Sequence, residues 1–294
     1  MQGPLFIFIA AVLWGLDGVL RRSLYSLPAP TIVFYEHLVG ALIIAPFLYV
    51  AWKHEVFTKR EWGAMSIVSL FSGALGTVLF TAALNETHFI SFSVVYLLQK
   101  LQPIFTIGTA WYVLNEKPTR AYALWALLAL IAGYFVTFPG GMVNFGEGGG
   151  YILAALLAFG AAVCWGSSTV FSRYVLLNHS NTVVTGLRFL LTVPIAFLFV
   201  LLLGKTESFS SVTPVQFGTL VFIALSTGML ALWIYYRGLA VTPARVSAIV
   251  ELAFPVTAVV IDYVLYGTML AFSQYLAAAV LLFAMYRIAQ TDRM

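Results

Sequence analysis

The chain has 294 residues, of which 62% are hydrophobic and 9% are charged. Soluble domains are roughly half apolar and about a quarter charged, so this composition excludes an ordinary soluble protein and indicates one that lies in a lipid bilayer. The single cysteine, Cys164, excludes an internal disulfide and a cysteine-rich metal site. The net charge of +4 comes from dispersed basic residues, so nucleic acid is not an expected partner.

Apolar segments long enough to cross a membrane recur ten times along the chain. A helix crosses about 30 Å of hydrocarbon with roughly 20 residues, and lipid offers an open strand no hydrogen-bond partner. The expected spans are 4–25, 30–52, 62–84, 90–114, 119–138, 149–177, 181–203, 214–236, 244–266 and 270–290. We therefore predict an all-α integral membrane protein with ten transmembrane helices.

The distribution of basic residues predicts the orientation of these helices. With the N-terminus in the cytoplasm, ten lysines and arginines fall at the inner face, whereas only Arg21, Arg22 and Lys205 fall at the outer face. Cytoplasmic loops of membrane proteins carry such an excess. Both termini are therefore expected in the cytoplasm, and the chain is expected in the inner, cytoplasmic membrane of the cell.

The sequence contains an internal repeat. The residues around Trp14 recur around Trp165 at an offset of 151, and Pro103 coincides with Pro255 at an offset of 152. Each half holds five expected helices, and an odd number requires the second half to enter the membrane from the opposite side. Such inverted repeats suit alternating access around a site near the membrane midplane. The predicted units are a first repeat at 1–138, an external glycine-rich linker at 139–148 and a second, inverted repeat at 149–294.

Several short motifs carry a resemblance to a known family. The pattern A-x-x-W-G opens each half, L-N-E-T-H-F-I-S leads into a helix with a central proline, and L-N-E-K-P-T follows that helix. In this order the motifs resemble the EamA-type branch of the drug/metabolite transporter superfamily, over nearly the whole chain. The resemblance implies a ten-helix carrier of small polar or amphipathic metabolites, with a central cavity lined largely by helices 1, 3, 4, 6, 8 and 9.

The two halves differ at positions where this family commonly has charged residues. The acidic residue after the fourth helix is Glu116 in the first half, but the aligned residue of the second half is Thr268. The arginine of the second helix is Arg188 in the second half and His37 in the first. Family roles therefore cannot be copied from one half to the other.

The first helix has three notable residues on one face, Trp14, Asp17 and Arg21. Asp17 and Arg21 are four residues apart, so they either form an ion pair or leave Asp17 as a site for a proton or a substrate ammonium group. Trp14 and Trp165 are expected to face each other across the repeat axis, where glycines allow close helix approach. Indoles there either stack on aromatic rings and cations or simply pack helices.

The fourth helix has a polar stripe formed by Tyr96, Gln99, Lys100 and Pro103. The proline frees the carbonyl of residue 99 from its helical hydrogen bond. Lys100 lies about 15 Å along the helix, so it needs a cavity or a charged partner.

The ninth helix repeats this stripe, with Glu251 aligned to Gln99 and Asp262 further along. A Lys100–Glu251 pair across the repeat interface either neutralises two charges or exchanges partners during transport. These readings remain open.

Of the four histidines, one falls within an expected helix and three fall in expected loops. His37 titrates near neutrality when unperturbed, although a packed histidine is the alternative. His54, His88 and His179 occupy predicted loops and are expected to have no special role.

The predicted site combines these residues. Substrate binding is assigned to Trp14, Tyr96, Gln99, Lys100, Trp165, Arg188 and Glu251. Coupling or gating is assigned to Asp17, Glu36, His37 and Asp262. The chain has no metal-ligand spacing and no phosphate-binding loop for ATP, so neither a metal nor a cofactor is expected.

The leading hypothesis is a secondary transporter that exports small zwitterionic metabolites such as amino acids by alternating access. Protons are a candidate coupling ion, and a monomer or homodimer is expected. The alternative is an importer of a quaternary amine such as choline, held in an aromatic cage. An intramembrane enzyme and a passive channel were also weighed, but the duplication and the midplane prolines favour transport over an enzyme.

The topology can be tested by labelling. In a Cys164→Ala background, Asn144→Cys in the linker should react with an impermeant thiol reagent added outside intact cells. Labelling that appears only after the membrane is broken would contradict the predicted orientation.

Overall fold

The computed structural model describes residues 2–53, 55–86, 98–99, 101–138, 141–142, 149–266 and 271–291. These residues form helices and turns, and they contain no strand. Within them, seven helices are long and apolar enough to cross a membrane. The chain is an all-helical integral membrane protein, as predicted; the number of ten spans stays a prediction.

The main helices of the first half, in the part of the chain that the structure describes, follow in chain order. They are α1 (Gln2–Arg21), α2 (Ala29–Trp52), α3 (Lys59–Val68) continued by the π-helix η2 (Ser69–Leu75) and α4 (Gly76–Glu86), then α6 (Gln102–Leu114) and α7 (Arg120–Thr137). The second half begins with α8 (Gly149–Leu176) and α9 (Asn181–Leu202). It continues with α10 (Pro214–Ile223), the π-helix η5 (Ala224–Gly228), α11 (Met229–Leu239), α12 (Ala244–Val250), α13 (Ala253–Tyr266) and α14 (Phe272–Thr291).

Side-chain caps fix where several helices begin. Thr58 and Glu61 form a capping box at α3, and Thr213 and Gln216 form one at α10. Each threonine accepts a bond from the backbone N–H three residues later, while the Glu or Gln accepts from the threonine N–H. The first backbone donors of these helices are thereby satisfied where the helices turn back toward the membrane.

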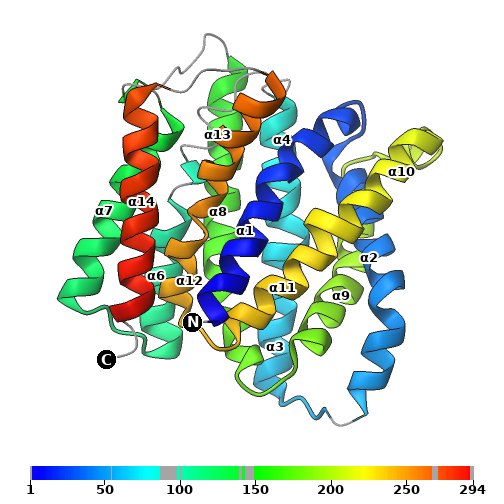
Figure 1. Cartoon of the computed structure of the whole chain (residues 1–294). Coiled ribbons are helices and arrows are strands. Elements are labelled where there is room, and N and C mark those ends of the chain that lie inside the picture. Colours follow the sequence, from blue (N-terminus) through cyan, green and yellow to red (C-terminus); the bar gives the residue numbers. More distant parts are fainter. Residues whose placement is uncertain are drawn as a thin grey trace.

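The main helix pairs join the two halves. α1 packs against α11 and α13, α2 against α9, α4 and α6 against α8, and α7 against α14. Figure 1 shows this bundle, in which α1 begins and α14 ends at the same end. Both termini on one side is the arrangement that the predicted topology requires, and the cytoplasmic assignment of that side stays a prediction.

Apolar side chains fill the bundle and also cover its outside. Ile7 of α1, Tyr236 of α11 and Leu281 of α14 are fully or almost fully buried in the largest apolar cluster. Leu42 and Leu124 are large apolar residues that remain exposed. Hydrocarbon solvates such side chains, so an apolar exterior is what a membrane helix needs.

The third helix of each half contains a π-helical segment, η2 in the first and η5 in the second. Gly73 of η2 and Gly228 of η5 are 155 residues apart, close to the offset of the sequence repeat. A π-helix inserts an extra residue into a turn and is frequently found at functional sites. Sequence periodicity did not reveal either segment.

The expected fourth and ninth helices, which contain Pro103 and Pro255, are broken, whereas α2 and α9 continue past Pro46 and Pro194. In the second half, α12 ends at Val250 and α13 begins at Ala253, so Glu251 and Leu252 form a turn. The break precedes Pro255 in the sequence, and a proline inside a helix removes the hydrogen bond to the carbonyl four residues earlier. In the first half Leu101 is a turn residue and α6 begins at Gln102, just before Pro103. The predicted spans 90–114 and 244–266 are therefore discontinuous where the structure describes them.

The glycine beside Trp165 allows a close helix approach, although the neighbour is α6 and not the first helix expected from the sequence. A Cβ atom on Gly166 would lie 2.6 Å from the carbonyl oxygen of Gln102 and 2.9 Å from the Cβ of Phe105. The hydroxyl of Thr106 donates to the Gly166 carbonyl at 3.0 Å. α8 and α6 thus touch backbone to backbone beside the break at Gln102.

Replacing Gly166 by alanine should push α8 away from α6 and destabilise the fold by about 1–3 kcal/mol. The matched control is Gly108→Ala on α6, where an added Cβ meets no atom within 4 Å. Thermal melting in detergent should fall for the first variant and stay level or rise for the second. Equal melting temperatures would contradict the close packing.

Candidate functional site

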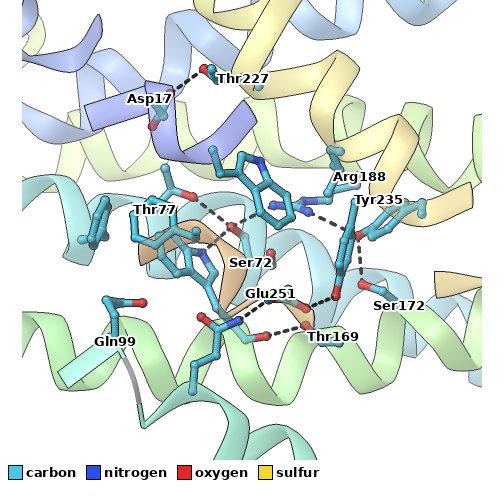
Figure 2. Close-up of a pocket in the computed structure, with 18 of the residues that line it drawn as sticks. Asp17, Ser72, Thr77, Gln99, Thr169, Ser172, Arg188, Thr227, Tyr235 and Glu251 are labelled. Carbon is cyan, nitrogen blue, oxygen red and sulfur yellow. Dashed lines mark hydrogen bonds between the residues drawn. The ribbon is translucent and has the colours of Figure 1, made fainter. Parts of the chain in front are cut away.

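A cavity of about 210 Å³ lies between helices of the two halves (Figure 2). Eight of the predicted site residues line it: Trp14, Asp17, Glu36, His37, Gln99, Trp165, Arg188 and Glu251. Tyr96, Lys100 and the side chain of Asp262 lie outside the described residues. The structure therefore brings the described candidates together, while their roles in transport stay predictions.

The cavity wall includes helices beyond the set that the family resemblance implies. Glu36 and His37 come from α2, the second expected span, and Arg188 comes from α9, the seventh. Three of the ionisable groups at the cavity thus lie on helices that the resemblance did not include.

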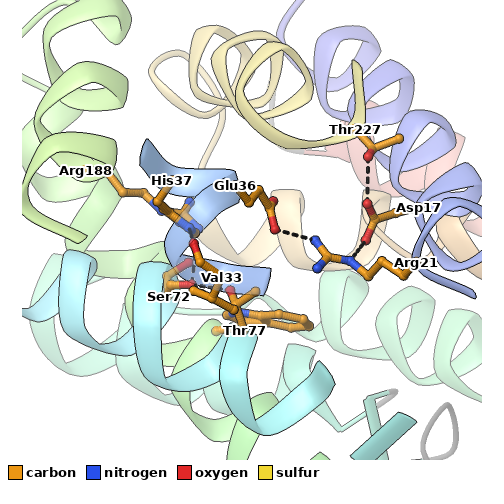
Figure 3. Close-up of polar contacts among 10 residues, drawn as sticks. Asp17, Arg21, Val33, Glu36, His37, Ser72, Thr77, Arg188 and Thr227 are labelled. Carbon is orange, nitrogen blue, oxygen red and sulfur yellow. Dashed lines mark hydrogen bonds and ion pairs between the residues drawn. The ribbon is translucent and has the colours of Figure 1, made fainter. Parts of the chain in front are cut away.

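One end of the cavity is closed by an ion-pair cluster. Arg21 is only 4% exposed and lies between the carboxylates of Asp17 and Glu36, with its Nη2 2.8 Å from Glu36 Oε2 (Figure 3). The other Asp17 oxygen accepts a hydrogen bond of 2.6 Å from Thr227 in η5. The ion-pair reading of Asp17 and Arg21 is therefore confirmed, and the cluster connects α1, α2 and the second half.

The carbonyl oxygen of Ser72 in η2 accepts hydrogen bonds from side chains of both halves. Thr77 Oγ1 donates to it at 2.9 Å, Trp165 Nε1 at 3.3 Å and Arg188 Nη2 at 3.2 Å. A π-helix shifts the backbone hydrogen-bond register, which leaves carbonyls such as this one available to side chains. Trp165 and Arg188 of the second half are thereby tied to the third helix of the first half.

Arg188 keeps unused donor capacity at the cavity. Its Nη1 lies 3.3 Å from the hydroxyl of Tyr236, a long contact, and its buried Nε has no hydrogen-bond partner among the described residues. No carboxylate in the part of the chain that the structure describes forms an ion pair with it. A guanidinium is always charged and only donates, so Arg188 is suited to an acceptor group on a substrate.

His37 lies next to Arg188 in Figure 3. Its Nδ1 lies 2.8 Å from the Val33 carbonyl, and its ring stacks on Phe189 at a centroid distance of 4.9 Å. The backbone carbonyl can only accept, so Nδ1 carries a proton. These contacts fit the packed-histidine reading, and a gating role stays a prediction.

Glu251 binds three neutral donors at the centre of the cavity. Its Oε1 accepts from the hydroxyls of Tyr235 at 2.5 Å and Ser247 at 3.1 Å. Its Oε2 accepts from Gln102 Nε2 at 2.9 Å. The predicted partner Lys100 lies outside the described residues, so that pairing stays a prediction.

Sequence reasoning selected Gln99 and missed Gln102, because the stripe assumed a continuous helix. Gln99 donates instead to the Ala158 carbonyl at 3.1 Å. The available signal was the position of Gln102 directly before Pro103, where a helix restarts.

Each tryptophan packs on an aromatic ring from the opposite half. Trp14 meets Tyr235 at a centroid distance of 5.1 Å and 51°, and Trp165 meets Phe80 at 5.1 Å and 50°. Phe80 and Tyr235 are 155 residues apart, the same offset as Gly73 and Gly228. All four rings line the cavity, which therefore has two aromatic walls of matching geometry.

Arg173 joins the halves at the end of the bundle where α1 begins. It forms an ion pair of 2.9 Å with Glu116 and donates to the Leu239 carbonyl at 2.5 Å. Glu116 also accepts from the backbone N–H groups of Ala244 and Arg245, each at 3.1 Å. Glu116 therefore caps α12 and holds α8 at the same time.

A second polar contact joins the halves at this end. His179 contacts Glu55 through Nδ1 and lies 3.3 Å from Glu61 through Nε2, while its ring stacks on Phe57 at 3.8 Å. The expectation that His179 has no special role is wrong, because it is buried between two carboxylates of the first half. His54 and His88 lie outside the described residues.

The comparisons with known proteins agree with this architecture. The family model for the EamA-like transporter family matches residues 1–138 and 152–289. The protein is thus a membrane transporter and not an enzyme. It belongs to the EamA-like transporter family.

Several relatives cover almost the whole chain. The riboflavin transporter ImpX of Fusobacterium nucleatum is 36% identical over 298 residues, covering 99% of each chain. An uncharacterized transporter of Bacillus subtilis, YwfM, is 24% identical and covers 98% of this chain and 94% of its own. A solved crystal structure aligns with a TM-score of 0.78 at 18% identity, covering 100% of this chain and 97% of that chain, which shows a shared fold.

The ion-pair cluster can be tested by a double-mutant comparison. Arg21→Met should cost about 3–5 kcal/mol because it leaves two buried carboxylates without a cation. Adding Glu36→Gln should recover part of this loss, since Asp17 keeps its bond from Thr227. Thermal melting of the single and double variants measures the effect, and additive losses would show that the groups do not interact.

Proposed function

We propose that the protein transports riboflavin, or a closely related flavin, across the membrane through the cavity between its halves. The observation that carries the proposal is the 36% identity to a riboflavin transporter over 99% of both chains. The aromatic and polar residues of the cavity support the same substrate.

The ring system of a flavin is flat, aromatic and largely apolar. Indole and phenol rings bind such systems by offset stacking or edge contacts. The cavity offers two such surfaces, Trp14 with Tyr235 and Trp165 with Phe80, contributed by different helices. A flat ring between them would contact both halves of the protein at once.

The polar edge of a flavin has several acceptors and one N–H donor, and its ribityl chain has hydroxyls. Arg188 supplies unused N–H donors for ring carbonyls. Gln99 and Gln102 supply amides, and Ser72 and Thr169 supply hydroxyls, all on the cavity wall. Apolar walls with a few placed polar groups are the usual form of a small-molecule site.

The transport model keeps the architecture expected from the sequence. Two inverted five-helix repeats, 1–138 and 149–294, joined by an external linker at 139–148, would rock around the cavity in the cytoplasmic membrane. Proton coupling, both termini in the cytoplasm and a monomeric or homodimeric state are parts of this proposal.

A small zwitterion such as an amino acid is the second candidate substrate, with export as the direction expected from the sequence. It is favoured by one observation: Arg188 and Glu251 present opposite charges to the same cavity. A quaternary amine such as choline would use the tryptophans and Glu251 alone.

Counterflow in proteoliposomes distinguishes these substrates. Vesicles loaded with unlabelled riboflavin should accelerate entry of labelled riboflavin, and excess alanine, leucine or choline should not compete. Exchange of an amino acid without exchange of riboflavin would reject the flavin and support the zwitterion. Net flux from vesicles of known protein orientation then gives the direction.

The tryptophan walls make a separate prediction. Trp14→Ala and Trp165→Ala should each weaken riboflavin binding by about 0.5–2 kcal/mol, the range for aromatic contacts, which is roughly 2- to 30-fold in Kd. Quenching of flavin fluorescence on titration with purified protein measures the affinity. The control is Trp111→Ala on α6, whose side chain is 58% exposed and outside the cavity lining. Equal affinity in all three variants would reject the proposed walls.

A further inference from the structure

We infer that Glu251 carries a proton together with the substrate, and that Gln102 transmits its protonation state to the cavity. This inference rests on the proposed transport function and adds the site and sense of the coupling. A protein that moves a proton and an uncharged substrate together in this way is a proton symporter.

The two residues lie where both broken helices meet. Glu251 occupies the turn between α12 and α13, and Gln102 is the first residue of α6 after the break at Leu101. Their hydrogen bond of 2.9 Å connects the second half to the first. Helix breaks near the membrane midplane are where transporters form sites for substrates and coupling ions.

The partners of Glu251 leave one oxygen for a proton. Oε1 accepts from the Tyr235 hydroxyl and also lies 3.1 Å from Ser247 Oγ, whose single proton is shared with the Tyr235 oxygen at 3.0 Å, whereas Oε2 accepts only from Gln102. An ionised carboxylate only accepts, while a protonated one donates from one oxygen. A proton arriving from the cavity would therefore bind Oε2, where it would face the N–H₂ group of Gln102.

Two donors cannot form a hydrogen bond, so the Gln102 amide must turn over. After the turn its carbonyl accepts the new O–H of Glu251, and its N–H₂ group is released from that bond. Gln102 lines the cavity, so the released donor becomes available to a substrate carbonyl. A flavin edge consists mainly of acceptors, and it therefore matches the protonated state.

Loss of solvation at Glu251 also favours its protonated form when the substrate binds. The three partners of Glu251 in the described residues are neutral, and a neutral substrate that displaces water from the cavity removes solvation from the carboxylate. Loss of solvation disfavours the charged form of an acid unless a cation replaces the water. Substrate binding and proton binding should therefore strengthen each other, which is the requirement for symport.

Several other ionisable groups lie on the helices around Glu251. Tyr235 of α11 bonds Glu251 directly, and Arg188 of α9 lines the same cavity. The carboxylates of Asp17 and Glu36 pair with Arg21, and the His37 ring contacts the Val33 carbonyl. The Tyr122 hydroxyl of α7 donates to the Arg245 carbonyl, and Arg173 of α8 pairs with Glu116. Lys100 lies outside the described residues. Of the described carboxylates that line the cavity, only Glu251 has neutral partners alone, since Asp17 and Glu36 both pair with Arg21.

The first experiment measures binding against pH. Riboflavin affinity of the wild-type protein should rise as the pH falls from 8 to 5, by up to about tenfold per unit, the limit for one linked proton. Glu251→Gln, which mimics the neutral acid, should bind riboflavin with no pH dependence. The matched control, Glu207→Gln, replaces an exposed carboxylate and should behave as wild type.

The second experiment separates coupling from exchange. In proteoliposomes, an acidic exterior should drive accumulation of riboflavin by the wild type and by Glu207→Gln. Glu251→Gln should keep riboflavin counterflow and lose the accumulation. Accumulation by Glu251→Gln would overturn the assignment of the proton to Glu251, whereas absent counterflow in the wild type would instead overturn the proposed substrate.

A third measurement needs no variant that might fail to fold. Adding riboflavin to the purified wild-type protein in weak buffer should take up protons and raise the pH of the solution. Binding without proton uptake at every pH from 5 to 8 would overturn the inference.

Discussion

The structure depends on one constraint: charged groups between the two halves must be satisfied by the protein, because the surrounding hydrocarbon cannot solvate them. The constraint is met differently along the bundle. Arg21 is held by two carboxylates at one end of the cavity, and Arg173 and His179 are held by carboxylates at the end where α1 begins. The centre differs, because Glu251 is bound by hydroxyls and an amide.

The contacts at the end of the bundle and those at its centre differ in how much it costs to separate them during alternating access. At the end where α1 begins, the carboxylates of Glu55, Glu61 and Glu116 belong to the first half, and their partners His179 and Arg173 belong to the second. Opening that end separates Arg173 from Glu116, which is costly unless water enters as the two charges part. The central contacts are single hydrogen bonds, so a change in protonation or the arrival of a substrate can alter them at a much smaller cost.

The sequence was informative wherever a feature repeats with a simple period. Long apolar segments predicted the helices, and the four-residue spacing allowed for the pair of Asp17 and Arg21. The Trp-Gly motif predicted a close helix approach at Gly166, but the helix that approaches is α6 and not the expected first helix. These features need only regular helices, for which sequence position fixes the face of a side chain. The family resemblance was confirmed by the match to residues 1–138 and 152–289.

The features that sequence reasoning missed are the ones where a helix departs from its regular period. A π-helix adds a residue to one turn, so it places Ser72 and Thr227 at the cavity from positions that a period of 3.6 does not indicate. Gln102, which follows the break at Leu101, contacts Glu251 although the expected stripe did not include it. His179 was missed for another reason, since its partners Glu55 and Glu61 lie over a hundred residues away in the chain.

The proposed transport requires that the cavity between the halves holds a flavin. An experimental structure of the protein with bound riboflavin tests this most directly. We predict that the ring lies between the Trp14–Tyr235 pair and the Trp165–Phe80 pair, with its polar edge toward Arg188 and Gln102. A flavin bound outside this cavity, or a cavity that stays empty at saturating riboflavin, would contradict the account.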